Sequence, residues 1–260
     1  MTRPRLVLSL AALPTLLGCL TLFPAPTPMQ SVLNSLPGPA KAHCLILLLP
    51  GRGDSAEDFS KKGVVEMLRS RQLSADIVSA NATLGYYLRG TMATRLEEDV
   101  VTPQRLRAYD HVFVFGISMG GMGALWLSRE QPALATEVFL MSPYLGDDDV
   151  SKQIRKSGGL ARWTPPARVS KLNEDNYQRE IWRWLQAVLA GKEKGPALLL
   201  GFGDRDRGMA SLETLAQALP ADHVLRAPGP HDWPTWRKLL GEYLDRGAME
   251  RACGSPEAGG

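Results

Sequence analysis

The residues best suited to chemistry in this sequence are a serine in a glycine turn, a histidine in a proline-glycine loop and two nearby aspartates. Ser118 lies at the centre of a G-x-S-x-G pentapeptide, residues 116–120, which directly follows the apolar run 112–115. Between a buried strand and a glycine-rich helix, this pattern indicates a nucleophile elbow, a turn so sharp that its flanking positions must lack bulk. The turn presents the hydroxyl beside the positive end of the next helix. Ser118 is therefore the candidate nucleophile.

A serine hydroxyl becomes a good nucleophile only when a base takes its proton, and histidine is the usual base. The chain has four histidines, and three of them (His43, His111 and His223) precede or open predicted strands. His231 instead follows a predicted strand, in a Pro-Gly-Pro loop. Because active residues of parallel sheets gather at the carboxyl ends of the strands, His231 is the predicted base.

A carboxylate is needed to orient the histidine and to stabilise its charged form. Two aspartates, Asp204 and Asp206, follow the apolar run 198–202 and therefore lie at the same predicted edge. The spacing of these two aspartates does not by itself show which one is the acid. Asp232 adjoins His231, but a sequence neighbour usually points elsewhere.

The elements that must position these residues alternate between strand and helix patterns. Short apolar runs predict strands at 45–49, 75–80, 112–115, 137–142, 197–202 and 223–227. Helical spacing of apolar residues predicts helices near 60–71, 92–101, 177–190, 209–219 and 233–246. This alternation predicts an α/β fold, with a mostly parallel, doubly wound sheet covered by helices on both faces.

Two segments resemble the α/β-hydrolase superfamily, in its carboxylesterase and acyl-protein thioesterase branch. The family segment H-G-x-G-D-S-A-x-D matches residues 50–58, with Pro50 in place of the histidine, and 118–125 read S-M-G-G-M-G-A-L. The second segment, together with the His-Asp-Trp run at 231–233, is also similar to esterase D-type enzymes.

This resemblance implies an α/β-hydrolase fold and roles for named backbone groups. The N–H groups of Arg52 and Met119 are implied as the oxyanion hole. The family pattern G-x-x-D, counted from Gly203, places the acid on Asp206, in the family order Ser, Asp, His. The stretch 143–176, which has no clear periodicity, is the implied cap insertion. Its three aspartates at 147–149 lack the ligand spacing of a calcium loop and indicate a solvated turn.

The amino terminus has the layout of a secretory leader. Two arginines, Arg3 and Arg5, precede an apolar run at 6–17 that is too short to span a membrane. The following Leu-Leu-Gly-Cys resembles a bacterial lipobox, which implies a lipoprotein signal peptide over 1–18 and lipidation of Cys19. The absence of aspartate after Cys19 favours the outer membrane of the cell envelope. An ordinary signal peptide, giving a secreted soluble protein, or an uncleaved anchor are the alternatives.

Composition divides the remainder into three parts. Proline-rich residues 19–42 predict a tether, 43–247 form the hydrolase domain, and the polar residues 248–260 predict a flexible tail. With Cys19 lipidated, only Cys44 and Cys253 remain. They fit no metal motif. A disulfide between them is an open alternative that has no positive support in the sequence.

The composition also excludes several functions. The chain has 260 residues, is 44% hydrophobic and 22% charged, and its net charge falls from +3 to +1 once the two leader arginines are subtracted. No basic field for nucleic acid exists, and no histidine spacing indicates a metal hydrolase. We therefore expect a cofactor-free serine hydrolase of small carboxylic esters or thioesters. A peptidase or acyltransferase with the same triad, or a binding protein on the same fold, are the alternatives.

Overall fold

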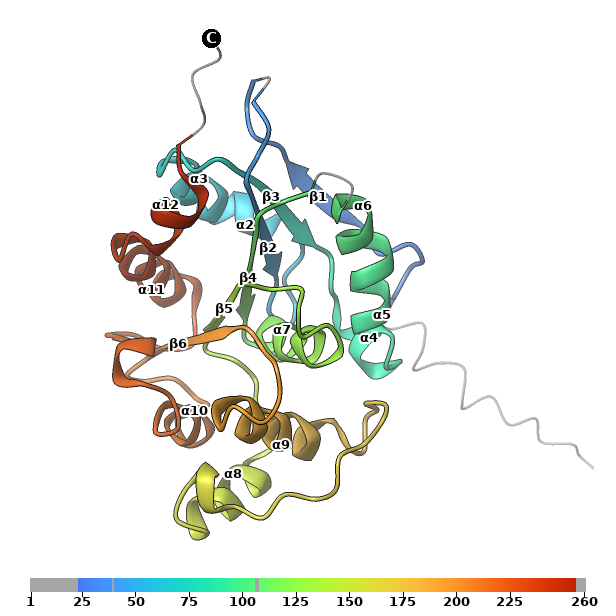
Figure 1. Ribbon diagram of the computed structural model, residues 1–260, viewed down its shortest axis with the longest axis vertical. Coiled ribbons are helices and arrows are strands. Elements are labelled where there is room, and N and C mark those ends of the chain that lie inside the picture. Colours follow the sequence, from blue (N-terminus) through green and yellow to red (C-terminus); the bar gives the residue numbers. More distant parts are fainter. Residues whose placement is uncertain (1–22, 39, 106–107, 256–260) are drawn as a thin grey trace, which may run out of the picture.

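The computed structural model describes residues 23–38, 40–105 and 108–255. A single seven-stranded sheet forms its centre, and six of the strands are parallel (Figure 1). In spatial order the strands are β1 (Ser31–Asn34), β3 (Ala75–Ala80), β2 (Cys44–Leu49), β4 (His111–Ile117), β5 (Glu137–Met141), β6 (Ala197–Gly203) and β7 (Val224–Ala227). The six predicted strands and the α/β-hydrolase type of sheet are confirmed.

Helices cover both faces because the strands are apolar on both sides. Alternate residues of β2 enter two separate cores: Leu45, Leu47 and Leu49 pack on one face, and Ile46 and Leu48 on the other. The first face carries α4 (Leu84–Leu88), α5 (Met92–Arg95), the π-helix η1 (Leu96–Val101), α7 (Met119–Glu130), α9 (Tyr177–Leu189) and α10 (Met209–Ala216). The second carries α2 (Asp58–Lys61), α3 (Val64–Arg69), α11 (Trp233–Asp245) and α12 (Ala248–Cys253). Further short elements are α6 (Thr102–Arg105), η2 (Leu160–Arg162) and η3 (Ala221–His223).

One helix prediction and one turn prediction need correction. The predicted helix over 60–71 is divided into α2 and α3, because Gly63 adopts a positive φ of 75° that no continuous right-handed helix accommodates. The predicted solvated turn at 147–149 is instead the start of α8 (Asp148–Lys156). Asp148 and Asp149 lie in its first turn, where negative charge interacts favourably with the helix dipole.

The prediction of a tether over 19–42 is wrong for much of the described part. β1 pairs antiparallel with β3, and the flanking residues Met29 and Leu36 are buried. The N–H of Met29 donates to Asp99 at 2.7 Å, and that of Leu36 donates to Asp76 at 2.6 Å. β1 is a short strand at the edge of the sheet. It lies in a proline-rich stretch, whose composition indicated a tether and not a strand.

The prediction of a flexible tail over 248–260 is wrong for residues 248–253. These residues form α12, and Cys253 makes a disulfide with Cys44 at the start of β2. Both cysteines are buried. No local pattern indicated this pairing, because 209 positions separate the two residues. Residues 256–260 lie outside the described part, as do the predicted leader and Cys19.

The register of the parallel strands aligns the carboxyl ends that carry the predicted site. Gly116 on β4 is paired with Leu49 on β2, and Ile117 is paired with Met141 on β5. Gly203 on β6 is paired with Ala227 on β7. The loops that follow these strands therefore meet along one edge of the sheet.

Candidate active site

The predicted nucleophile elbow is present between β4 and α7. Ser118 has φ 51° and ψ −112°, a strained conformation for a residue with a side chain. The turn requires glycine on both sides of the serine. A Cβ at Gly116 would overlap the carbonyl of Gly120, and one at Gly120 would overlap the carbonyl of Leu49. The G-x-S-x-G pattern is thus a steric condition of this turn.

The structure brings Ser118, His231 and Asp206 into one hydrogen-bonded chain. The Nε2 atom of His231 lies 2.9 Å from the Ser118 hydroxyl oxygen. Its Nδ1 atom lies 3.0 Å from each carboxylate oxygen of Asp206. This geometry fits a tautomer in which Nδ1 donates to the carboxylate and Nε2 accepts from the hydroxyl.

The neighbouring aspartates have other partners. Asp204 accepts a hydrogen bond from the N–H of Gly229 at 2.9 Å and so holds the loop that carries His231. Asp232 caps α11 by accepting from the N–H of Thr235 at 3.0 Å. Asp206, and neither of these two, reaches His231.

The other three histidines lie away from this edge. The ring of His43 pairs with Asp110 at 2.9 Å, just before the amino ends of β2 and β4. The ring of His223 bonds the carbonyl of Leu198 at 2.9 Å, and His111 begins β4. Their positions agree with the predicted placement.

Asp206 is held ionised in a nearly buried position. Burial by itself raises the pKa of this carboxyl. The hydrogen bonds from His231, the N–H of Gly208 and Ser142 outweigh that effect, and the pKa is lowered below its ordinary value. A carboxylate that stays charged can stabilise an imidazolium next to it.

Two residues that support Asp206 were missed at the level of sequence. Ser142 directly follows β5, is buried, and has a positive φ of 47°. Its hydroxyl accepts a hydrogen bond from the indole N–H of Trp236 at 3.1 Å and interacts with Asp206. The ring of Trp236 also packs edge-on against that of His231, 5.1 Å away. The only signal was that Ser142 closes a predicted strand.

The segment that follows β2 lies against the nucleophile, as the oxyanion prediction requires. A Cβ at Gly51 would be 3.6 Å from the Cβ of Ser118. In the part of the chain that the structure describes, the N–H groups of Arg52 and Met119 donate no hydrogen bond to another protein group. The side chain of Asp54 accepts a hydrogen bond from the indole N–H of Trp233 at 3.2 Å.

A cavity of about 370 Å³ opens beside the three residues. The beginning of the predicted cap insertion forms one wall, with Tyr144, Leu145 and Asp147. The Tyr144 hydroxyl donates to Asp147 at 3.2 Å, and the side-chain amide of Gln178 on α9 donates to the same carboxylate at 3.1 Å. The cavity is thus shaped by the cap and anchored to α9.

The chain is similar to a known protein family. The model of the family described as "Putative esterase" matches residues 52–246. The chain belongs to this esterase family. The match covers the elbow, both candidate acids and His231, so this esterase is a hydrolase of the α/β-hydrolase fold. No curated protein sequence matches it.

Solved structures of the same fold share little sequence with the esterase. The serine hydrolase FphF of Staphylococcus aureus is 13% identical, with a TM-score of 0.57 over 84% of this chain and 98% of that one. Est1E of Butyrivibrio proteoclasticus is 15% identical, with a TM-score of 0.57 over 86% and 94%. The S-formylglutathione hydrolase FrmB of S. aureus is 13% identical, with a TM-score of 0.53 over 84% and 95%. At these identities the likeness concerns the fold.

Within the described residues, no group of three or more His, Cys, Asp or Glu side chains could hold a metal ion. The helices described there are also too short or too polar to cross a bilayer.

Proposed function

We propose that this esterase hydrolyses small carboxylic esters or thioesters through an acyl-enzyme on Ser118. The observation that carries the proposal is the continuous contact from the hydroxyl of Ser118 through His231 to Asp206. This arrangement gives the serine a base, and gives the base an orienting carboxylate.

In the first half of the reaction, the Ser118 oxygen attacks the carbonyl carbon while Nε2 of His231 takes the hydroxyl proton. The N–H groups of Arg52 and Met119 donate to the oxyanion that forms. His231 then gives its proton to the departing alcohol or thiol, and the acyl group stays on Ser118. In the second half, His231 takes a proton from water, the hydroxide attacks the acyl carbon, and the acid leaves as the proton returns to Ser118.

A small substrate is supported by the size of the cavity. A volume of about 370 Å³ is at the lower end of the range for small-molecule sites. FphF was solved with substrate bound, and Est1E with ferulic acid. Turnover of p-nitrophenyl esters of rising chain length should therefore be greatest for short acyl groups. A preference for long chains would contradict this assignment.

The role of Ser118 is tested by the Ser118→Ala variant. Hydrolysis of p-nitrophenyl acetate should fall by about 10⁴-fold or more. Ser211→Ala is the matched control, because Ser211 lines the same cavity but bonds Ser151 at 3.1 Å and should leave turnover nearly unchanged. Wild-type turnover in Ser118→Ala protein would refute the mechanism.

Labelling and product analysis separate the alternatives. A fluorophosphonate probe should label wild-type protein and not Ser118→Ala protein, whereas a binding protein on this fold would not be labelled. Release of free acid in the presence of added alcohols or amines supports a hydrolase. Transfer of the acyl group to those acceptors would indicate an acyltransferase, and cleavage of peptides a peptidase.

We also propose that the protein is exported to the bacterial cell envelope and lipidated on Cys19. The disulfide between Cys44 and Cys253 supports an oxidising compartment. Labelled fatty acid should be incorporated into the wild-type chain and not into Cys19→Ser protein, which should leave the membrane fraction. An unlabelled wild-type chain found free in the medium would favour the secreted alternative.

A further inference from the structure

A second hollow lies on the cap, separate from the catalytic cavity. We call it the cap groove; it is enclosed by residues 158–166 of the cap insertion, the second half of α9, and residues 217–218 after α10. Its volume is about 970 Å³, and none of its lining residues lines the catalytic cavity. The reaction proposed at Ser118 therefore assigns no function to the cap groove.

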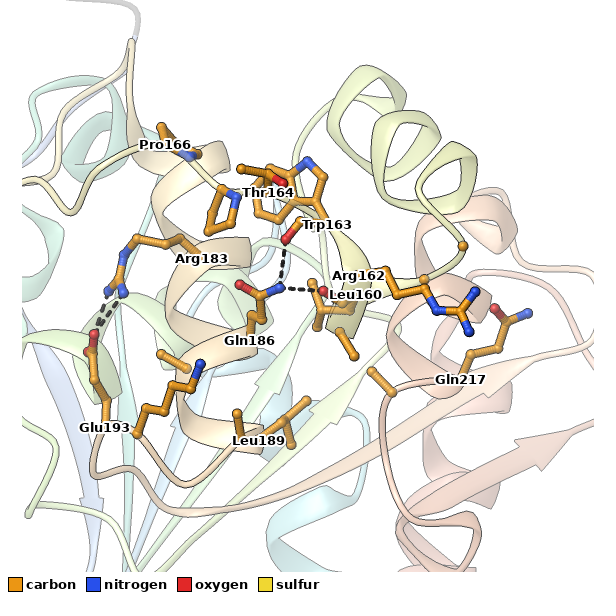
Figure 2. A pocket seen from close by; sticks show the side chains of 18 of the residues that line it. Leu160, Arg162, Trp163, Thr164, Pro166, Arg183, Gln186, Leu189, Glu193 and Gln217 are labelled. Carbon is orange, nitrogen blue, oxygen red and sulfur yellow. Dashed lines mark hydrogen bonds and ion pairs between the residues drawn. The ribbon is translucent and has the colours of Figure 1, made fainter.

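Specific contacts hold the walls of the cap groove in place. The side-chain amide of Gln186 donates to the carbonyl of Leu160 at 2.6 Å and to that of Trp163 at 2.8 Å, as Figure 2 shows. These bonds fix the 158–163 loop against α9. Trp163 and Leu160 are themselves buried in the core. The groove is therefore preformed, which lowers the cost of binding a ligand.

The rim of the cap groove carries an excess of positive charge. Arg162, Arg168 and Lys192 line it, and in the described part of the chain none of the three forms an ion pair or a side-chain hydrogen bond. The carboxylate in the lining, Glu193, is bonded by Arg183 at 2.7 Å, which lowers its pKa, and the nearby charge of Arg168 acts in the same direction. Figure 2 shows this neutralised pair on one side of Gln186 and Arg162 on the other.

The floor between these charges is apolar. Leu189 lies below Gln186 in Figure 2, and Ala187, Ala190 and Ala218 add further small apolar surface. Leu189 and Ala218 pack on the main core and are only partly buried, so apolar area is left exposed in the groove. Burying such area against a ligand releases free energy in proportion to its size.

We propose that the cap groove binds an anionic amphiphile, specifically a single-chain carboxylic acid in its monomeric form. The carboxylate would be held by the unpaired cations of the rim, and the alkyl chain would cover the alanine and leucine floor. The chemistry follows from the charge imbalance of the rim and the apolar floor together. A neutral ligand would leave the cations unused, and a cationic ligand would be repelled.

Calorimetric titration of the full chain with decanoate tests the proposal. The catalytic serine is first blocked with a fluorophosphonate, so that heat from the catalytic cavity is excluded. We expect decanoate to bind with one site per chain, and decanol and decyltrimethylammonium to bind at least about tenfold more weakly. Raised salt should weaken binding of decanoate, because the rim charges are exposed.

Two variants test the rim charges and the apolar floor of the cap groove separately. The triple variant R162Q/R168Q/K192Q should lose at least about tenfold in decanoate affinity, whereas K61Q/K62Q/R237Q, outside the groove, should bind as wild type does. Ala187→Phe fills the floor and should weaken decanoate with every rim cation retained. Turnover of p-nitrophenyl acetate by unblocked protein should be unchanged in all three.

Several results would overturn the proposal. They are an absence of binding heat, equal binding of decanol, or full affinity in the triple variant. Binding to anionic phospholipid vesicles without binding to monomeric decanoate would also overturn it, because it would make the groove a membrane contact.

Discussion

Asp206 and Glu180 are both carboxylates removed from water, at two different places in the molecule. Asp206 is 4% exposed and faces one imidazole, whose second nitrogen reaches Ser118 beside a cavity. Glu180 on α9 is 1% exposed and lies between two guanidinium groups, Arg129 of α7 at 3.1 Å and Arg183 at 2.8 Å. Both are buried charges with basic partners.

The difference between them lies in what the partner can do. Arginine keeps its proton at all accessible pH values, so the Glu180 cluster is a fixed arrangement of charges. Arg129 also bonds the carbonyls of Val169 and Ser170, which ties the end of the cap insertion to α7. Histidine can gain and lose a proton near neutral pH. In the proposed mechanism Asp206 serves catalysis because its partner, His231, can pass a proton to Ser118, whereas the arginine partners of Glu180 keep their protons.

The largest expected effect is the loss of turnover when Asp206 is changed. Asp206→Asn should reduce kcat for p-nitrophenyl acetate by about 10⁴-fold, because an amide no longer selects the histidine tautomer that the serine needs. Asp204→Asn is the matched control, since asparagine keeps an oxygen for the N–H of Gly229. It should retain turnover within a few-fold, and the opposite ranking would make Asp204 the acid.

At Glu180 the expected effect is on stability. Glu180→Gln should lower the free energy of unfolding by about 3 kcal/mol or more, because two buried guanidinium groups lose their shared counter-charge. Urea denaturation measures this loss, and kcat of the folded protein should remain close to wild type. Glu213→Gln breaks the exposed pair with Arg226 and should cost about 1 kcal/mol or less. A large loss of kcat in folded Glu180→Gln protein would contradict the distinction between a carboxylate for turnover, Asp206, and a carboxylate for stability, Glu180.

A third prediction concerns the disulfide between Cys44 and Cys253, which is remote from both carboxylates. Cys253→Ser should reduce stability by about 2–5 kcal/mol, because the bond closes a very long loop in the unfolded chain. Turnover below the unfolding temperature should be unchanged, since Cys44 begins β2 at the end of the sheet opposite to Ser118. Thermal unfolding with and without reductant should show the same difference in the wild-type protein. Loss of turnover without loss of stability would contradict this assignment.

The smallest effect is expected at Ser142, which we infer to be a positioning residue. Ser142→Ala and Ser142→Gly both remove the hydroxyl that interacts with Asp206, so both should lower kcat by about fivefold, the equivalent of one hydrogen bond. Stability should separate them. The φ of 47° suits glycine, so Ser142→Gly should be the more stable variant by about 1 kcal/mol. Equal stability or different kcat values would contradict the inference.

The same two variants should change how stability depends on pH. The lowered pKa of Asp206 stabilises the fold above the pKa of the unfolded chain, and this contribution is lost as pH falls through the folded value. Loss of the Ser142 hydroxyl raises the folded pKa toward the unfolded value, so the acid-induced loss of stability should be smaller in both variants and should be complete at a higher pH. Urea midpoints measured from about pH 6 to pH 3 test this.

Much of the fold and the site follows from local sequence patterns. The apolar runs predicted six strands because each buried strand contains enough information in itself. The glycines around Ser118 predicted the elbow because their spacing is a steric requirement of one turn. His231 could be proposed because the carboxyl ends of parallel strands share an edge. The same argument left Asp204 and Asp206 as candidate acids, and the family pattern favoured Asp206.

Other features depend on partners far away in the chain. β1 exists because β3 offers it a sheet edge, and α12 is held by Cys44. Ser142 and Trp236 gain their roles only when the register of β5 and the packing of α11 bring them to Asp206. The sequence by itself determined the strands, the elbow and the residue types of the triad, since these are conditions on neighbouring residues. The tertiary structure showed that Asp206 meets His231, for which the sequence offered only a family resemblance, and that Glu180 meets Arg129 and Arg183, because both contacts depend on distances between separate elements.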